Sequence, residues 1–91
     1  MKISFDPAKN ERNVLERQLD FSRVEQWDWT RSVIDEDTRK DYGERRFRAV
    51  GFIDERLFVL VFTPRNGDVH VISLRKANIR EIKRHAEASK S

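Results

Sequence analysis

The sequence predicts a single α+β domain over residues 1–91, in which an antiparallel sheet of about four strands lies between N-terminal helices and a C-terminal helix. Three observations predict this architecture. The run LFVLVF at residues 57–62 is apolar throughout, which is typical of a central strand covered on both faces. The dipeptide Asn66-Gly67 is a strong signal for a β-hairpin. Signals for helices stand near both ends of the chain, outside the segments that favour strands.

The beginning of the chain predicts a helix. Residues 3–5 form either a short edge strand or an extended lead into that helix. Asp6 is a good N-cap and Pro7 suits the first helical position, so we expect the helix to begin here and to end near Leu19. Asn13 lies in its middle, where this residue type is unfavourable unless its side chain forms a hydrogen bond.

A shorter helix and a strand are expected next. Ser22 is expected to cap this helix, with Glu25 completing a capping box and the helix ending at Trp27. β-Branched and aromatic residues then favour a strand at about residues 30–35. Trp27 and Trp29 either pack in the core or stack on nucleic-acid bases, and packing in the core is the preferred interpretation.

The second half of the chain predicts hairpin-connected strands. A polar, glycine-containing loop at residues 35–44 precedes a strand at residues 46–53, where side chains alternate between two faces. A turn at residues 54–55 leads to the apolar run, and the last strand is expected at residues 69–74.

A C-terminal helix is expected to begin at Arg75 and Lys76 and to run to about Ala86, with Ile79 and Ile82 on its apolar stripe. Two cations at a helix N-terminus oppose the helix dipole, which favours anions there. The conflict is relieved if this corner of the fold holds a phosphate. The alternative is that nearby Asp or Glu residues neutralise both cations.

Charge is distributed unevenly along the chain. Residues 1–44 carry 8 basic and 11 acidic side chains, a net charge of −3, whereas residues 45–91 carry 11 basic and 5 acidic ones, a net charge of +6. This asymmetry indicates either an anionic partner for the second half, with nucleic acid first, or a solvated surface of mixed charge.

Composition narrows the classes of function. The absence of Cys excludes disulfides and thiolate metal sites, and the two histidines do not form a metal-ligand cluster. We therefore expect no metal and no cofactor. No apolar run approaches the roughly 18 residues that a membrane helix needs, and no signal peptide is recognisable, so a cytoplasmic protein is expected.

Three cations at strand ends predict a phosphate-binding site. Arg46 opens one strand of a hairpin and Arg65 closes the next, so these residues should lie at the same end of the sheet although 19 positions separate them. Arg75, supported by Lys76, is expected at a sheet end as well. Guanidinium groups bind phosphate through two parallel hydrogen bonds. The alternative for each arginine is a surface ion pair.

Four side chains are candidates for proton transfer, namely those of Tyr42, Glu44, His70 and His85. By strict alternation His70 shares a strand face with Ile72 and Leu74, which favours a semi-buried packing role over a catalytic one. His85 follows Glu81 by four positions on the expected helix, so the two side chains can simply pair.

Three blocks of sequence resemble the BrnT family of type II toxin–antitoxin toxins. They are DTRKDYGERRFRAVG, RLFVLVFTPR and VISLRKANIREIKR, in that order. Within these blocks, the residues that match the family's motif are Glu44, Arg46, Arg65, Arg75 and Lys76. In the N-terminal third, Lys9, Asn13 and Phe21 fit the family's spacing, but Glu16-Arg17-Gln18 stands in place of its Lys-His-Gly. His70 replaces a frequent arginine, and His85 stands where tyrosine is common.

The resemblance implies a RelE-like fold and a ribonuclease that arrests growth by cutting RNA. It also implies a BrnA-like antitoxin with a ribbon-helix-helix part, through which the complex would bind operon DNA. We interpret the chain as a metal-independent RNA endonuclease that inhibits translation and growth. Arg46, Arg65, Arg75 and Lys76 would bind the RNA phosphate, and Glu44, His70 and His85 are candidate proton carriers. The alternatives are a non-catalytic RNA- or protein-binding module and a structural half of a repressor complex.

Overall fold

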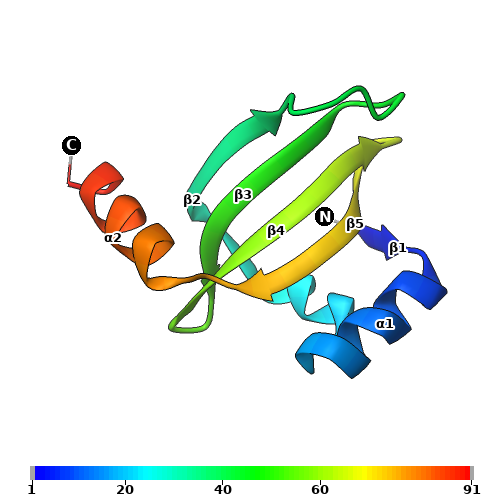
Figure 1. Cartoon of the computed structure of the whole chain (residues 1–91), viewed down its shortest axis with the longest axis horizontal. Helices are drawn as coiled ribbons and strands as arrows, with labels where there is room; N and C mark the ends of the chain where they lie inside the picture. The colour runs from blue at the N-terminus through cyan, green and yellow to red at the C-terminus, as the bar shows by residue number, and fades with distance from the viewer. Residues whose placement is uncertain (1, 91) are drawn as a thin grey trace.

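The computed structural model describes residues 2–90 and shows helices packed around a single twisted sheet (Figure 1). In chain order its elements are β1 (Ile3–Phe5), α1 (Pro7–Arg17), the 3₁₀ helix η1 (Phe21–Gln26), β2 (Trp27–Asp37), β3 (Arg46–Ile53), β4 (Arg56–Arg65), β5 (Asp68–Lys76) and α2 (Ile79–Ala88). Within the described residues, every helix is too short or too polar to cross a membrane.

The five strands are ordered β1-β5-β4-β3-β2. The strand β4 is central and antiparallel to both of its neighbours, which confirms the prediction for residues 57–62. The expected count of about four strands and the purely antiparallel arrangement need correction, because β1 adds a fifth strand that runs parallel to β5. The three residues of β1 carry no local signal for parallel or antiparallel pairing. The position of β5 alone decides the direction in which β1 pairs.

The two hairpin turns form as the sequence predicts. Asn66 and Gly67 both adopt positive φ angles, 52° and 81°, as a two-residue turn that matches the twist of its strands requires. The strand β3 has the predicted bounds. The strand β2 is longer than predicted and is irregular between Asp28 and Val33. There, the Asp28 carboxylate accepts hydrogen bonds from the backbone and the hydroxyl of Thr30.

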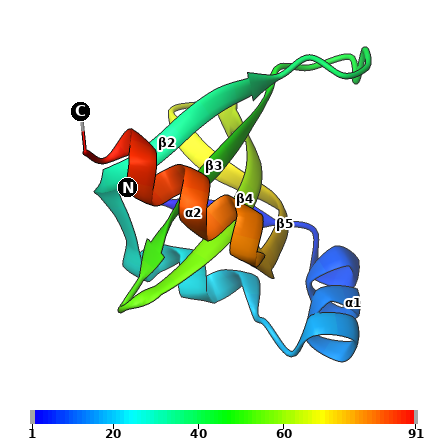
Figure 2. The same ribbon diagram turned by 60° about the vertical axis from the view of Figure 1, so that its left-hand side comes forward.

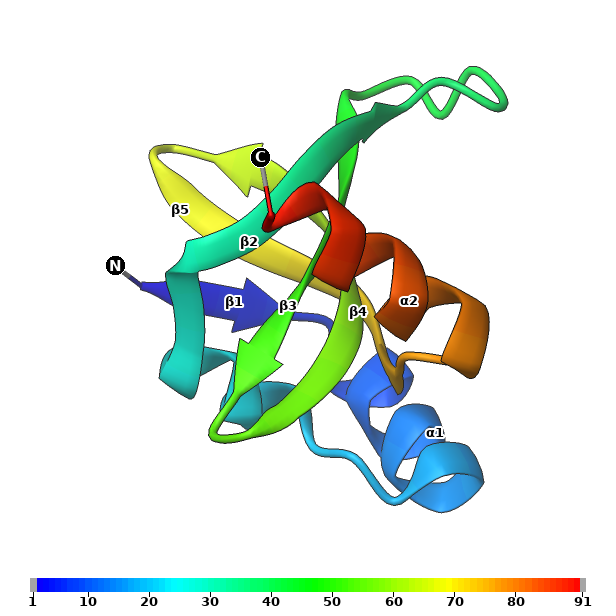
Figure 3. The ribbon, with the colours of Figure 1, turned by 90° about the vertical axis from the view of Figure 1, so that its left-hand side faces the viewer.

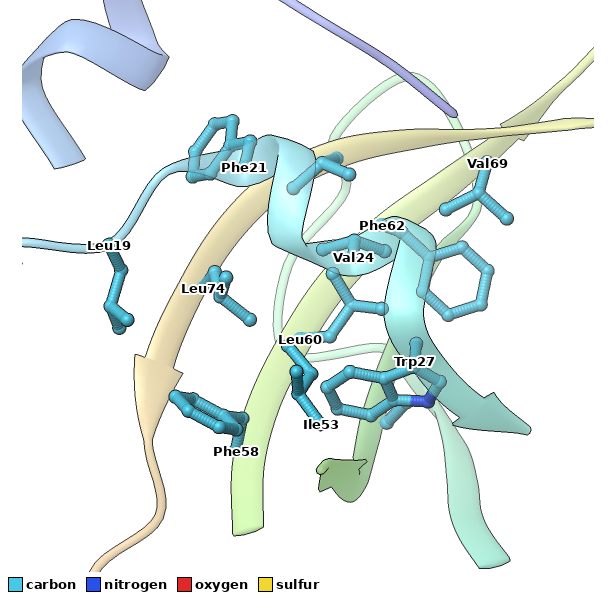
Figure 4. Packing of buried hydrophobic residues seen from close by; sticks show 12 residues of the cluster. Leu19, Phe21, Val24, Trp27, Ile53, Phe58, Leu60, Phe62, Val69 and Leu74 are labelled. Carbon is cyan, nitrogen blue, oxygen red and sulfur yellow. The ribbon is translucent and has the colours of Figure 1, made fainter. Parts of the chain in front are cut away.

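The main core lies between the sheet and η1. Phe21 and Val24 of η1 pack onto Phe58 and Leu60 of β4 and onto Leu74 of β5 (Figure 4). The prediction that the tryptophans pack is confirmed, since Trp27 is buried, with its Nε1 donating to the Ser32 hydroxyl at 2.6 Å, and Trp29 packs against the same cluster.

The N-terminal helices differ from the expectation at their ends. The helix α1 ends at Arg17, because Gln18 adopts a left-handed conformation and turns Leu19 into the core. The N-cap of η1 is Asp20, whose carboxylate accepts from the backbone of Ser22, so the predicted Ser22 cap was wrong. The hydrogen bond expected of Asn13 is confirmed: its buried Nδ2 donates to the carbonyls of Leu19 and Leu74.

The C-terminal helix begins later than predicted. Arg75 and Lys76 are the last residues of β5, where they pair with Val59 and Phe58, and the N-cap of α2 is Asn78. The side chain of Glu81 completes a capping box with Asn78. The helix dipole therefore meets a carboxylate in the first turn, and the expected conflict with two cations does not exist.

The helix α2 lies across the side of the sheet opposite to η1 (Figures 2 and 3). Its buried contact is His85, whose ring packs edge-on against Phe52 at 5.4 Å. The predicted stripe is only partly covered, because Ile79 and Ile82 stay 68% and 38% exposed. Much of this second side of the sheet therefore remains uncovered.

Candidate functional site

All of the predicted arginines lie on the α2 side of the sheet. Arg48 and Phe52 of β3 contact α2, so the alternate residue Arg46 shares their side. Arg75 pairs with Val59 and His70 pairs with Thr63, and alternation along β4 places Arg65 on this side as well. We call this surface the arginine face, formed by Arg46, Arg48, Thr63, Arg65, His70 and Arg75.

A bulge in β5 gives His70 its direction. The register between β4 and β5 shifts after the pair Val61–Ser73, so that Phe62 pairs with Val71 and Ile72 is the additional residue. Such a shift reverses the side to which the following side chains point. Val71 and Leu74 therefore both face the core, whereas His70 points to the arginine face. Strict alternation placed His70 with Leu74, and that prediction was wrong.

Arg46 and Arg65 come together at one end of the arginine face, as the hairpin argument predicted. Both contact the carboxylate of Glu44, Arg46 through Nε at 3.8 Å and Arg65 through a terminal nitrogen at 3.4 Å. We call these three residues the Glu44 cluster. Two guanidinium groups share one carboxylate, so the cluster keeps a net charge of +1.

The Arg46 side chain has an unused donor. Its guanidinium lies 3.9 Å from the centre of the Tyr42 ring, a cation–π contact that orients the group. Its Nε is the one buried side-chain nitrogen or oxygen in residues 2–90 that has no hydrogen-bond partner. An unsatisfied buried donor costs about 1–3 kcal/mol, and an anion that accepts from this nitrogen would remove that cost.

A second cluster ties α2 to the sheet. Arg75 donates from both terminal nitrogens to the two oxygens of Glu81, each at 2.8 Å, and Arg48 donates to the same carboxylate at 2.6 Å. These contacts, with hydrogen bonding from Arg75 first, lower the pKa of Glu81 to about 2, and the same bond raises the pKa of Arg75. We call Arg48, Glu81 and Arg75 the Glu81 cluster.

The three predicted cations therefore do not converge on one point. Arg75 is level with Val59 on β4, four residues from Thr63, which is roughly 13 Å at the usual rise per residue. The alternative that a carboxylate neutralises Arg75 is the arrangement observed, with Glu81 as that carboxylate. Lys76 ends β5 and does not begin a helix.

The candidate proton carriers separate in space. His70 is half-buried beside the Glu44 cluster, and burial first and then the charge of Arg65 lower its pKa. His85 is buried under α2, where Nε2 donates to the Arg31 carbonyl at 2.8 Å. The expected pairing of His85 with Glu81 was wrong, because Glu81 faces the two arginines of its cluster.

Two residues of this surface were missed by sequence reasoning. Arg48 is two positions after Arg46, so strand alternation already contained the signal that it shares the face. Ser4, whose hydroxyl lies 2.9 Å from Nδ1 of His70, had no such signal, because the contact depends on the parallel pairing of β1 with β5.

The fold and the site define a small α+β protein whose open sheet face presents paired guanidinium groups suited to an anionic ligand. Among the described residues, no three His, Asp or Glu side chains gather as metal ligands would. Residues 5–81 match the model of a protein family described as the ribonuclease toxin, BrnT, of type II toxin–antitoxin systems. The chain belongs to this family, which implies an RNA target and an antitoxin partner. A search of curated proteins finds no match.

Proposed function

We propose that the chain is a metal-independent RNA endonuclease that inhibits translation and growth. The 2′-hydroxyl of the RNA would attack the adjacent 3′-phosphate, leaving a cyclic phosphate and a free 5′-hydroxyl. What this chemistry needs most is preorganised positive charge at the phosphate. The observation that carries the proposal is the Glu44 cluster, in which Arg46 has an unpaired buried donor and both arginines make only long contacts to Glu44.

Each arginine receives a separate role in this proposal. Arg46 and Arg65 bind the phosphate that is attacked, and the Tyr42 ring holds the guanidinium of Arg46 in place. Arg75 contributes positive charge further along the RNA path, and its bonds to Glu81 limit it to that role. Lys76 pairs with the core-facing Phe58 and therefore points to the other side of the sheet, so it receives no role in binding the phosphate. Proton transfer is assigned to the part of the face that holds Glu44 and His70. His85 is assigned to packing, because it is buried under α2.

The decisive experiment incubates the purified chain with RNA in the presence of EDTA. Cleavage that leaves cyclic phosphate ends supports the proposed enzyme. Cleavage that EDTA abolishes contradicts metal independence. Binding without cleavage supports the alternative of an RNA-binding module, and neither binding nor cleavage leaves a structural role within a repressor complex.

We further propose that the antitoxin is a BrnA-like protein whose ribbon-helix-helix part binds the operon DNA, and that it covers part of the arginine face. Each arginine pair on this face exceeds its carboxylate by one charge, which supports an acidic segment as the covering element. Electrostatic steering should make association faster at low salt. Both proposed ligands, the RNA and the antitoxin, are expected in the cytoplasm. Recovery of only the free chain after co-expression with the neighbouring gene product would count against this proposal.

A further inference from the structure

Three neighbouring strands place hydroxyl side chains on both sides of His70. The register pairs Ser4 of β1 with His70 of β5, and His70 with Thr63 of β4. Thr63 is buried, and its hydroxyl donates to the Arg45 carbonyl at 2.6 Å, one residue before Arg46. The row Ser4–His70–Thr63 therefore leads across the sheet directly to the Glu44 cluster.

The two ring nitrogens of His70 have different surroundings. Nδ1 lies 2.9 Å from the Ser4 hydroxyl. Among residues 2–90, Nε2 has no hydrogen-bond partner, yet it is not one of the buried unpaired atoms, so it is open to solvent. One nitrogen of the ring is thus held by the protein, and the other is free to meet a ligand on the arginine face.

The charged groups around His70 come from β4, from α1 and its N-cap, and from the loop before β3. Arg65 of β4 and Lys9 of α1 disfavour a second positive charge on the ring, whereas Glu44 and Asp6 favour it. Burial has the largest effect, and the resulting pKa lies below the ordinary value of 6.5. The ring is therefore mainly neutral at pH 7, as a proton acceptor must be.

We propose that Ser4 is a positioning residue that accepts a hydrogen bond from Nδ1–H of His70, so that Nε2 carries the lone pair and acts as the general base on RNA. This inference rests on the proposed ribonuclease function and deepens it. In the step, the 2′-hydroxyl proton passes to Nε2 and the 2′ oxygen bonds to phosphorus. The bond from phosphorus to the 5′ oxygen breaks, and that oxygen takes a proton from water.

The other candidates for the base are less suitable. The Glu44 carboxylate is shared by two arginines, because Oε1 contacts Arg46 and Oε2 contacts Arg65. His85 is buried under α2 with its Nε2 committed to a backbone carbonyl. His70 alone among these three combines an open nitrogen with a position beside the phosphate-binding arginines.

The test compares RNA cleavage by wild type, His70→Gln, Ser4→Ala and Ser4→Thr across pH 5–8. For wild type, kcat should rise with pH to a plateau, and the midpoint of the rise should lie below pH 6.5. His70→Gln should abolish this rise and lower kcat by roughly 10²–10⁴-fold, the usual contribution of general base catalysis. Ser4→Ala should lower kcat by about tenfold with KM little changed, and Ser4→Thr, which keeps the hydroxyl, should restore it. Ser22→Ala is the matched control, because this exposed serine belongs to η1, on the side of the sheet opposite to the arginine face.

A second measurement does not depend on activity. The chain has only two histidines, so ¹⁵N NMR of the imidazoles resolves His70 once His70→Gln has assigned its signals. Wild type and Ser4→Thr should show the Nδ1–H tautomer of His70, and Ser4→Ala should show a mixture of tautomers. An Nε2–H tautomer in wild type, or wild-type cleavage by His70→Gln or Ser4→Ala, would overturn the inference while leaving the ribonuclease proposal intact. Failure of wild type to cut any RNA would instead overturn the proposed function.

Discussion

The Glu44 cluster and the Glu81 cluster contain the same groups, two arginines and one glutamate on one sheet face, but they differ in how tightly these groups bond. Glu81 receives three hydrogen bonds of 2.6–2.8 Å from its arginines, and its side chain is only 12% exposed. Glu44 meets its arginines at 3.4 and 3.8 Å and is 31% exposed. The arginines of the Glu81 cluster donate to a carboxylate of α2 and so hold that helix. The arginines of the Glu44 cluster still have donors that a ligand can accept from.

The difference arises from where each glutamate is anchored. Glu81 lies in the first turn of α2, where the capping box with Asn78 fixes its backbone and its side chain. Glu44 lies in the loop before β3, just after Gly43 with its positive φ of 75°. A rigid carboxylate can satisfy two guanidinium groups at once, and a carboxylate on a loop can be displaced by phosphate.

The largest expected effect is a loss of catalysis when an arginine of the Glu44 cluster is removed. Arg65→Ala should lower RNA cleavage by roughly 10²–10³-fold, the usual effect of removing one preorganised donor to a developing charge. Its melting temperature should stay close to that of wild type, because the side chain is 52% exposed and makes only a long contact. Arg84→Ala is the matched control, because this exposed residue of α2 forms no ion pair within residues 2–90, and it should change neither quantity. An Arg65→Ala chain that cuts RNA as wild type does would remove the cluster from the site.

Acid should reduce the stability that the Glu81 cluster contributes, and this loss should fall in a defined range of pH. The pKa of Glu81 is about 2 in the folded chain, against an ordinary 4.5, so the unfolded chain takes up this proton first as the pH falls. The stabilisation is present above pH 4.5 and is lost as the pH falls from 4.5 to 2. Urea unfolding across this range should show a smaller loss in Glu81→Gln than in wild type, and the remaining loss should come from carboxylates such as Asp28 and Asp37, whose pKa values are also lowered. Glu87→Gln, on the exposed part of the same helix, controls for the loss of one carboxylate.

Arg75→Ala should lower the stability of the fold, although the sequence alone indicated a role for Arg75 in phosphate binding. Removing this residue leaves Glu81 with one arginine fewer in a mostly buried position, at a cost of about 2 kcal/mol. In a domain of this size the melting temperature should fall by roughly 10 °C. Thermal unfolding followed by circular dichroism measures it, with Arg80→Ala as the control on the exposed side of α2. Unchanged stability combined with lost cleavage would assign Arg75 to the phosphate site instead.

The smallest expected effect on RNA cleavage comes from removing the Tyr42 ring, which lies against the guanidinium group of Arg46. Tyr42→Leu removes a cation–π contact worth about 0.5–1 kcal/mol, so RNA cleavage should fall only two- to fivefold. Tyr42→Phe keeps the ring but loses the long hydroxyl bond to Asp37, at 3.3 Å, and should cut RNA at nearly the wild-type rate. Equal losses in the two variants would show that the hydroxyl, and not the ring, positions Arg46.

Local signals in the sequence determined most of the sheet. Alternation predicted β3 with its observed bounds, and the apolar run predicted the central position of β4. The Asn66-Gly67 turn joined β4 to β5 as expected. These features depend on neighbouring residues, whose periodicity and turn chemistry are readable without knowing the rest of the fold. The meeting of Arg46 and Arg65 followed from hairpin topology for the same reason.

Tertiary structure decided the features that depend on residues far apart in the chain. Arg75 and Lys76 continue β5 because β4 offers them strand partners, so the helix begins only after Asn78. The bulge at Ile72 turned His70 from the core to the arginine face, although strict alternation predicts the opposite.

The charges show the same dependence. The two halves of the sequence differ in net charge, yet the fold interleaves them, so that Glu36 and Glu44 from the first half pair with Arg45, Arg46 and Arg65 from the second. The Ser4–His70 contact joins residues 66 positions apart through a parallel pairing that has no local signal. Local preferences select the helices and strands. The contacts that give this surface its chemistry form only when distant strands pair, because no short segment of the chain contains both partners of such a contact.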